Sequence, residues 1–457
     1  MRLYSIKMVT VQILSFKFQT KVPMRKYSTL LVVLCLFHFI GCTSSAQQPF
    51  VYETSKTVQQ LERKLFDLPD IQFERVENRG DDPAFLLKVR QPIDHGDEHA
   101  GFFYQRVLLV HHGFDKNVVF NTNGYGLEQK PAELSKLLDA NYLSVEHRYF
   151  GPSTPQEKDW QYLTIQQATA DYHHIRNLLG QIYQGKWIGT GISKGGETAT
   201  YYRFYYPDDV SVTVPYVAPF PIGLKDQRFY PFFESTGTQA CREKIEAFQL
   251  SVLKNKKEIL PRLKYYLKGK GAQVKLIGGV EAALELFVLE YPFSFWQSGK
   301  DCNKIPDADA SPEELLDYLV DGGDYWYLLD DSTEDLAAHY YQHATQLGYY
   351  GYRTERFGDL VQKWNGEPSA CFFPYDKALE FDPSIRKSVT DWLQTDADGI
   401  VFIYGAVDTW TVAQAELGEN KRVQKFILPG KHHGNARIRF AEPDVREEII
   451  KQIKEKL

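Results

Sequence analysis

Hydrophobic and polar positions along the first half of the chain alternate between strand-like and helix-like patterns. Residues 84–95 and 101–113 are strand-like runs, and 134–151 passes from a helical pattern to a strand and then to a turn. Residues 164–183 carry apolar or small side chains at helical spacing, and an apolar strand-like run follows at 186–193. This alternation predicts a parallel or mixed sheet with helices on both faces.

The pattern changes near Ile222, after which helical periodicity dominates until the strand-like run that begins at Gly399. Four segments carry that periodicity: 241–269, 279–296, 311–323 and 333–352. The chain then returns to alternation and ends in a helical segment. We therefore predict one α/β sheet domain, residues 50–222 and 386–457, interrupted by a helical cap insertion over residues 223–385.

Residues 1–41 have the composition of a secretory signal peptide. They hold six basic residues and no acidic residue, and the apolar run 30–37 precedes a small-residue processing site. All three methionines lie in this leader, which leaves Met24 as an alternative start. Gly41 and Cys42 resemble a bacterial lipoprotein signal in which Cys42 carries the lipid, and an ordinary cleaved signal is the alternative. We expect a protein exported to the bacterial cell envelope or secreted, with this anchor as its only contact with the membrane.

Charge and cysteine content narrow the classes of partner. Without the leader there are 47 basic and 59 acidic residues, a formal net charge of −12, which argues against a nucleic-acid partner. Beyond Cys42 the cysteines are Cys241, Cys302 and Cys371, and this odd number allows at most one disulfide among them. The sequence has no C-x-x-C motif, so we expect no thiolate zinc site.

Residues 191–195, Gly-Ile-Ser-Lys-Gly, match the G-x-S-x-G motif of a nucleophile elbow. A strand-like run precedes Ser193 and a helical pattern follows it, which is the context in which a sharp turn exposes a serine above a sheet. The alternative is a glycine turn with a solvated serine. We interpret Ser193 as the nucleophile of an acyl-transfer enzyme.

A serine nucleophile needs a base and an acid, and in α/β-hydrolases these follow in the order Ser, Asp or Glu, His. A strand-like run after the insertion leads to Asp408, whereas Asp396 and Asp398 precede that run and are typical of a turn. The next strand-like run leads to His432 and His433, and spacing alone leaves both as candidate bases. This order predicts an α/β-hydrolase fold with a Ser–His–Asp triad.

The chemistry around this triad needs an oxyanion hole but no metal. The hole should combine the N–H of Lys194 with an N–H from the turn near Gly113 or Phe114. His339 and His343 have the spacing of a helical zinc pair, but no Glu follows His339, so we interpret both as core or surface residues. We expect neither a metal nor a cofactor.

Several segments together resemble the secreted serine exopeptidases of the α/β-hydrolase fold. RQPIDH, FFYQR, EHRYFGPS, YLTIQQATAD and GISKGG are similar to signature segments of this class. The lysosomal Pro-X carboxypeptidase and dipeptidyl peptidase II group shares the Q-P-x-D-H, E-H-R-Y and Y-L-T segments, and the lysine after Ser193 is closer to the bacterial tripeptidyl aminopeptidases, serine peptidase family 37. The resemblance covers most of residues 85–222 and returns over 399–437. It implies a triad of Ser193, Asp408 and a histidine of GKHHGNAR, and it favours His432, because the first of the paired histidines is catalytic in the lysosomal group.

The resemblance also implies roles for residues outside the triad. Thr409 stands where relatives often have proline, which bears on the shape of the loop after Asp408. Glu146 and Arg148 are expected to form a structural ion pair near the site. The insertion corresponds to a helical cap that restricts the site to chain ends.

These inferences predict an exported serine exopeptidase that acts on peptides. The resemblance implies an aminopeptidase that releases di-, tri- or tetrapeptides from N-termini and prefers proline before the cut. Cap carboxylates such as Asp330, Asp331 or Glu334 are candidates to bind the α-ammonium group. A carboxylesterase or lipase of the same fold is one alternative, and a non-catalytic surface-binding lipoprotein is another, which the intact Ser, Asp and His argue against.

Overall fold

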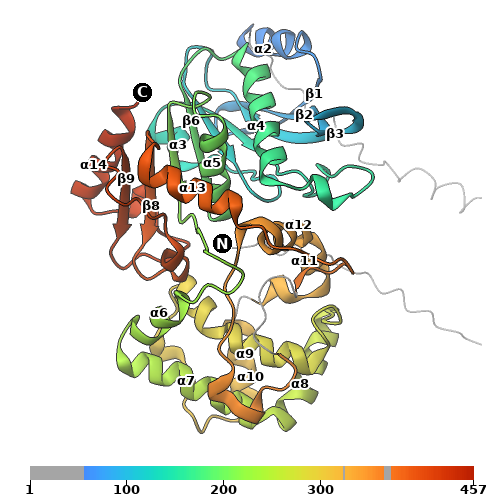
Figure 1. Ribbon diagram of the computed structural model, residues 1–457, viewed down its shortest axis with the longest axis vertical. Helices are drawn as coiled ribbons and strands as arrows, with labels where there is room; N and C mark the ends of the chain where they lie inside the picture. Colours follow the sequence, from blue (N-terminus) through green and yellow to red (C-terminus); the bar gives the residue numbers. More distant parts are fainter. Residues whose placement is uncertain (1–55, 323–324, 365–371) are drawn as a thin grey trace, which may run out of the picture. The chain divides into compact units, whose positions relative to one another are not determined.

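The computed structural model describes residues 56–322, 325–364 and 372–457 (Figure 1). Residues 62–457 form one compact unit, and the unit before them is described only from residue 56, where helix α2 (Lys56–Phe66) begins. The signal peptide, the start at Met24 and the lipid anchor at Cys42 therefore lie outside the described residues and stay predictions.

The described chain forms a mixed sheet with the strand order β1-β2-β3-β5-β4-β6-β7-β8-β9. Strands β1, β2, β3 and β5 pair antiparallel, whereas β5, β4, β6, β7, β8 and β9 are parallel neighbours. The strands are β1 (Ile71–Arg79), β2 (Asp82–Asp94), β3 (Asp97–Val110), β4 (Val118–Thr122), β5 (Asn141–Val145), β6 (Trp187–Ile192), β7 (Val212–Tyr216), β8 (Ile400–Gly405) and β9 (Val423–Leu428). This mixed sheet confirms the α/β-hydrolase fold, although the sequence pattern did not single out the short strand β4.

Helices cover both faces of the sheet, as the alternation of side chains on β8 shows. Val401 and Ile403 pack with residues of α3 and α14, whereas Phe402 and Tyr404 belong to a separate cluster with residues of α4, α5 and α13. Alternate residues of a strand point to opposite faces, so the two clusters lie on the two sides of the sheet. These helices are α3 (Glu133–Leu137), α4 (Ile165–Gly180), α5 (Lys194–Tyr205), α13 (Ser384–Thr395) and α14 (Pro443–Lys454).

Between β7 and α13 the described chain is helical. Its helices are α6 (Phe229–Ser235), α7 (Gln239–Lys254), α8 (Lys256–Lys270), α9 (Val280–Gln297), α10 (Pro312–Gly322), α11 (Asp330–Asp335) and α12 (Ala337–Gln342) (Figure 1). Helix α9 is apolar on nearly every side because it is the centre of this segment, buried from Ala282 to Trp296. None of the helices in the described ranges is long and apolar enough to cross a membrane.

A disulfide joins Cys241 on α7 to Cys302, 61 residues later in the chain. The Thr238 side chain accepts the N–H of Cys241 and so caps the start of α7 beside this bridge. The sequence allowed at most one disulfide among three cysteines without naming the pair, and the structure selects this one. Cys371 lies outside the described residues.

Removing the bridge should destabilise the protein, because it closes a long loop in the unfolded chain. We expect the double replacement Cys241→Ser with Cys302→Ser to lower the free energy of unfolding by about 2–4 kcal/mol. Urea denaturation followed by circular dichroism measures the loss. Dithiothreitol should produce a similar loss in the parent protein and none in the double variant; an equal effect on both proteins would contradict the role assigned to the bridge.

Candidate active site

Ser193 lies in a sharp turn between β6 and α5, with φ 58° and ψ −126°. This conformation is uncommon for a residue with a side chain and marks a strained position. The backbone N–H of Ser193 donates to the carbonyl of Tyr216 at the end of β7 (2.8 Å), and its own carbonyl accepts the N–H of Glu197 (3.0 Å). The serine side chain is partly exposed, as the elbow motif predicts.

Glycines make this turn possible because backbones meet there without space for side chains. A Cβ on Gly191 would lie 2.1 Å from the carbonyl oxygen of Gly195. A Cβ on Gly195 would lie 2.6 Å from the carbonyl oxygen of Asn123, which follows β4. The two glycines of the motif therefore permit both the elbow and its contact with the loop after β4.

Asp408 and His433 meet at the same edge of the sheet, because each follows the carboxyl end of a parallel strand, β8 and β9. His433 Nδ1 and Asp408 Oδ2 are 2.8 Å apart, and the Asp408 side chain is fully buried. The other carboxylate oxygen of Asp408 accepts the N–H of Trp410 (3.1 Å), which fixes the orientation of the carboxylate.

The partner of Asp408 is thus His433, whereas the sequence analysis favoured His432. Adjacent residues in this turn project in different directions. The N–H of His432 donates to Asn435 Oδ1 (2.6 Å), and its ring lies against Gly299. The choice of His432 is therefore corrected by one residue, and spacing in the sequence had left both histidines open.

Gly113 does not lie near the elbow. Strand β3, which precedes it, runs antiparallel to β5, so it ends at the edge where the parallel strands begin. There the N–H of Gly113 donates to Asn141 Oδ1 (3.1 Å), at the first residue of β5. The prediction that Gly113 contributes to the oxyanion hole is therefore wrong, because it took the turn after β3 for the turn after β4.

The loop after β4 occupies the place expected for the second oxyanion donor. A Cβ on Gly124, which has φ +75°, would lie 2.7 Å from the N of Gly195. The side chain of the next residue, Tyr125, lies near enough to Ser193 for the serine to lower its pKa. The sequence analysis missed this loop, although the apolar run of β4 followed by glycines at 124 and 126 is the pattern that marks it.

Lys194 and Glu197, on the first turn of α5, are buried ionisable groups directly behind Ser193. Burial lowers the pKa of Lys194 to about 7, with Glu197 opposing the shift. Burial raises the pKa of Glu197 to about 8, with Lys194 and then Arg386 opposing it. Burial, reinforced by Glu197, also raises the pKa of Tyr125, and Ser193 acts in the opposite direction.

Helix α9 of the insertion holds the loops that carry Asp408 and His433. Thr409 Oγ1 donates to the carbonyl of Phe293 (3.1 Å), and the N–H of His433 donates to the carbonyl of Gln297 (3.1 Å). Gln297 Oε1 also accepts the indole N–H of Trp410 (3.2 Å). Thr409 thus uses its hydroxyl to anchor the loop of Asp408 to the insertion.

Glu146 and Arg148 do not pair with each other, contrary to the expectation from the sequence. Glu146 accepts two bonds from Arg106 (2.8 and 2.6 Å), and Arg148 donates two bonds to Asp171 (2.7 and 2.8 Å). Each buried charge therefore has its own bidentate partner, the arrangement in which a buried ion pair is tolerated.

The histidines with zinc spacing are core residues. His339 and His343 are both buried, and His343 Nδ1 contacts the carbonyl of Gly348 (2.7 Å). Their rings pack 4.2 Å apart, and His339 lies against Tyr125. Within the described ranges, no group of three or more potential metal ligands gathers.

A cavity of about 720 Å³ lies in the helical insertion. Phe293, Trp296 and Tyr350 line it, together with the carboxylates of Glu243 and Glu246. The ring of Phe293 lies 5.0 Å from that of Trp410, so the cavity adjoins the loop of Asp408.

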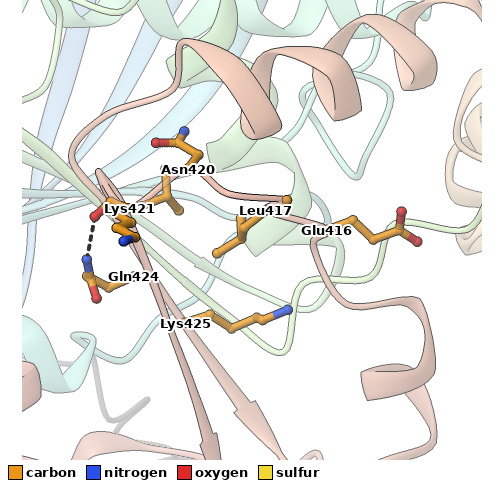
Figure 2. A pocket seen from close by; sticks show the side chains of 8 residues that line it. Glu416, Leu417, Asn420, Lys421, Gln424 and Lys425 are labelled. Atoms are coloured by element: carbon orange, nitrogen blue, oxygen red, sulfur yellow. Dashed lines mark hydrogen bonds between the residues drawn. The ribbon is translucent and has the colours of Figure 1, made fainter.

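Two other regions are separate from this cavity. The pocket in Figure 2, lined by eight residues between Glu416 and Lys425, lies around the beginning of β9, at the opposite end of that strand from His433. Asp330, one of the carboxylates suggested for the α-ammonium group, accepts the N–H groups of Lys275 (3.1 Å) and Leu276 (3.0 Å). Neither Asp330 nor its neighbours Asp331 and Glu334 line the cavity.

The sequence model of the family described as PS-10 peptidase S37 matches residues 54–454. The chain belongs to the peptidase S37 family. The prolyl tri/tetrapeptidyl aminopeptidase of Streptomyces mobaraensis is 34% identical to this S37 peptidase over 358 residues, which are 77% of this chain and 75% of the relative. These findings confirm the resemblance stated from the motifs and establish a serine peptidase.

Solved structures similar to this S37 peptidase share little sequence with it. Proline iminopeptidase of Mycobacterium smegmatis has 13% identity and a TM-score of 0.38, and the match covers 84% of this chain and 98% of that one. A peroxisomal α/β-hydrolase of Saccharomyces cerevisiae has 12% identity and a TM-score of 0.35, with 85% and 90% covered. The fold is shown by the strand order described above.

The packing at the elbow predicts that Gly191→Ala inactivates the S37 peptidase. Its Cβ would overlap the backbone of Gly195, so we expect a loss of stability above about 3 kcal/mol or a displaced Ser193. Labelling of Ser193 by a fluorophosphonate, together with thermal unfolding, measures both effects. Gly223→Ala is the matched control, since a Cβ there meets nothing within 4 Å. Equal labelling of the two variants would refute this account of the elbow.

Proposed function

We propose that this protein is an exported serine aminopeptidase in which Ser193, His433 and Asp408 form the catalytic triad. The observation that carries the proposal is the 2.8 Å contact between His433 Nδ1 and Asp408 Oδ2. It lies at the sheet edge where the strained Ser193 is presented. Membership of the S37 family supports the same chemistry.

The proposed reaction uses the ring nitrogen of His433 that does not contact Asp408. Asp408 holds His433 through Nδ1, which leaves Nε2 to take the proton of Ser193 as its oxygen attacks the peptide carbonyl. The backbone N–H groups of Lys194 and Tyr125 stabilise the oxyanion that forms. His433 then gives the proton to the leaving amine, and water hydrolyses the acyl-enzyme by the same route in reverse. No cofactor enters any of these steps.

We propose that the substrate is the N-terminal end of a peptide, with three or four residues released and proline before the cut. The name of the Streptomyces relative supports this specificity. The cavity in the insertion has the size to hold a few residues. Its charged lining residues are four carboxylates, Glu234, Glu243, Glu246 and Glu355, and three arginines, Arg242, Arg353 and Arg356, and we propose Glu243 and Glu246 as the carboxylates that bind the α-ammonium group.

Export is proposed from the leader at residues 1–41, with lipidation of Cys42 as the anchor. The disulfide between Cys241 and Cys302 supports export, because such bonds form and persist in oxidising compartments.

The assignment of the base predicts different losses for two adjacent histidines. His433→Ala should lower kcat/KM on a tripeptide anilide by at least about 10³-fold, as Ser193→Ala should, because both remove part of one catalytic unit. His432→Ala, the matched control, should cost much less. The assignment is refuted if His432→Ala is the variant that matches Ser193→Ala.

The substrate assignment predicts that hydrolysis needs a free N-terminus. Digestion of a defined peptide library, read by mass spectrometry, should release tripeptides and tetrapeptides ending in proline. N-terminal acetylation should lower the rate by at least about tenfold, because it removes the charge that the carboxylates bind. Cleavage unaffected by acetylation would end the aminopeptidase proposal, and hydrolysis of short esters alone would support an esterase.

A further inference from the structure

The side chain of Lys194 is buried in a position where a lysine is costly. It is 1% exposed, although burial of an amine or an ammonium without compensation is unfavourable. Its Nζ donates to the carbonyl of Gly124 (2.8 Å) and lies 5.7 Å from the ring centres of both Tyr125 and Phe150. The charged and the neutral forms of the group both carry N–H donors, so this bond does not depend on its protonation state.

The acceptor of this bond belongs to the loop that contacts Ser193. The carbonyl of Gly124 and the N–H of Tyr125 are parts of one planar peptide group and point in opposite directions. A donor that holds the Gly124 carbonyl on the buried side therefore directs the Tyr125 N–H to the other side. Among the residues that the structure describes, the Tyr125 N–H donates to no hydrogen-bond acceptor.

The neighbouring carbonyls of this loop are held in the same way. The Tyr125 carbonyl accepts the N–H of His147 (2.8 Å), and the Gly126 carbonyl accepts the Asn123 side chain. The N–H of Leu127 donates to Glu146 Oε1 (3.1 Å). Backbone groups and the side chains of Asn123 and Glu146 thus anchor the far part of the loop, whereas Lys194 holds the peptide group next to Ser193.

We propose that the side chain of Lys194 is a positioning residue of the oxyanion hole, which holds the Gly124–Tyr125 peptide so that the Tyr125 N–H faces the reacting carbonyl. This inference rests on the proposed function. The residue after the nucleophile then acts twice, through its own backbone N–H and through its side chain on the second donor. Glu197, also on the first turn of α5, raises the pKa of the buried amine against the effect of burial.

The test is Lys194→Met, which keeps the aliphatic chain and removes the donor. We expect kcat on the tripeptide anilide to fall about 10–100-fold with KM changed less than about threefold, because only the transition state uses the hole. Binding of a matched peptide boronic acid, whose tetrahedral adduct places a hydroxyl in the hole, should weaken by a similar factor. Thr200→Val, which removes another buried polar contact on α5, is the control expected to retain kcat.

Each outcome bears on the proposal. Wild-type kcat in Lys194→Met, or a lower kcat with unchanged boronate affinity, overturns it. Should this variant not fold, the same measurements are made on Lys194→Gln, and failure of both variants to fold assigns Lys194 to stability alone and also overturns it. Fluorophosphonate labelling of the parent protein separates the two hypotheses, because an unlabelled Ser193 refutes the proposed function whatever Lys194→Met does.

Discussion

The candidate active site depends on close backbone packing at the elbow, where there is no room for side chains. Gly124 in the loop after β4 and Gly191 and Gly195 in the elbow approach so closely that none of the three has room for a Cβ. This contact brings the loop after β4 against the start of α5 and keeps Ser193 in its strained turn. It also carries the Lys194 side chain beneath that loop, where the carbonyl of Gly124 meets its amine.

The loop after β5 also contacts and supports the loop after β4. Its Glu146 is held by Arg106 and receives the N–H of Leu127, while the N–H of its His147 binds the carbonyl of Tyr125. Arg148 is fixed in turn by Asp171 on α4. The segment EHRYF therefore supports the loop after β4 through paired, buried charges. Its role near the site is structural and not catalytic.

The helical insertion is joined to the catalytic loops through the C-terminal part of α9. Carbonyls of Phe293 and Gln297 receive Thr409 and His433, and Phe293 also lines the cavity proposed for the substrate. One helix thus contacts the loops of Asp408 and His433 and lines the cavity. The site proposed for the substrate and the loops of the proposed acid and base therefore share one structural element.

The sequence by itself determined the α/β class, and it supplied the predictions of an elbow at Ser193 and of Asp408 as the acid, because these depend on local periodicity, glycine spacing and the order of strand ends. It also carried the motifs that place the chain among the S37 peptidases. Only the tertiary structure paired Asp408 with His433 rather than His432, placed Gly113 at the opposite edge of the sheet from the elbow, and paired Cys241 with Cys302. Those choices depend on which edge of the sheet a strand ends at and on the direction of each side chain in a turn, and long-range pairing sets both.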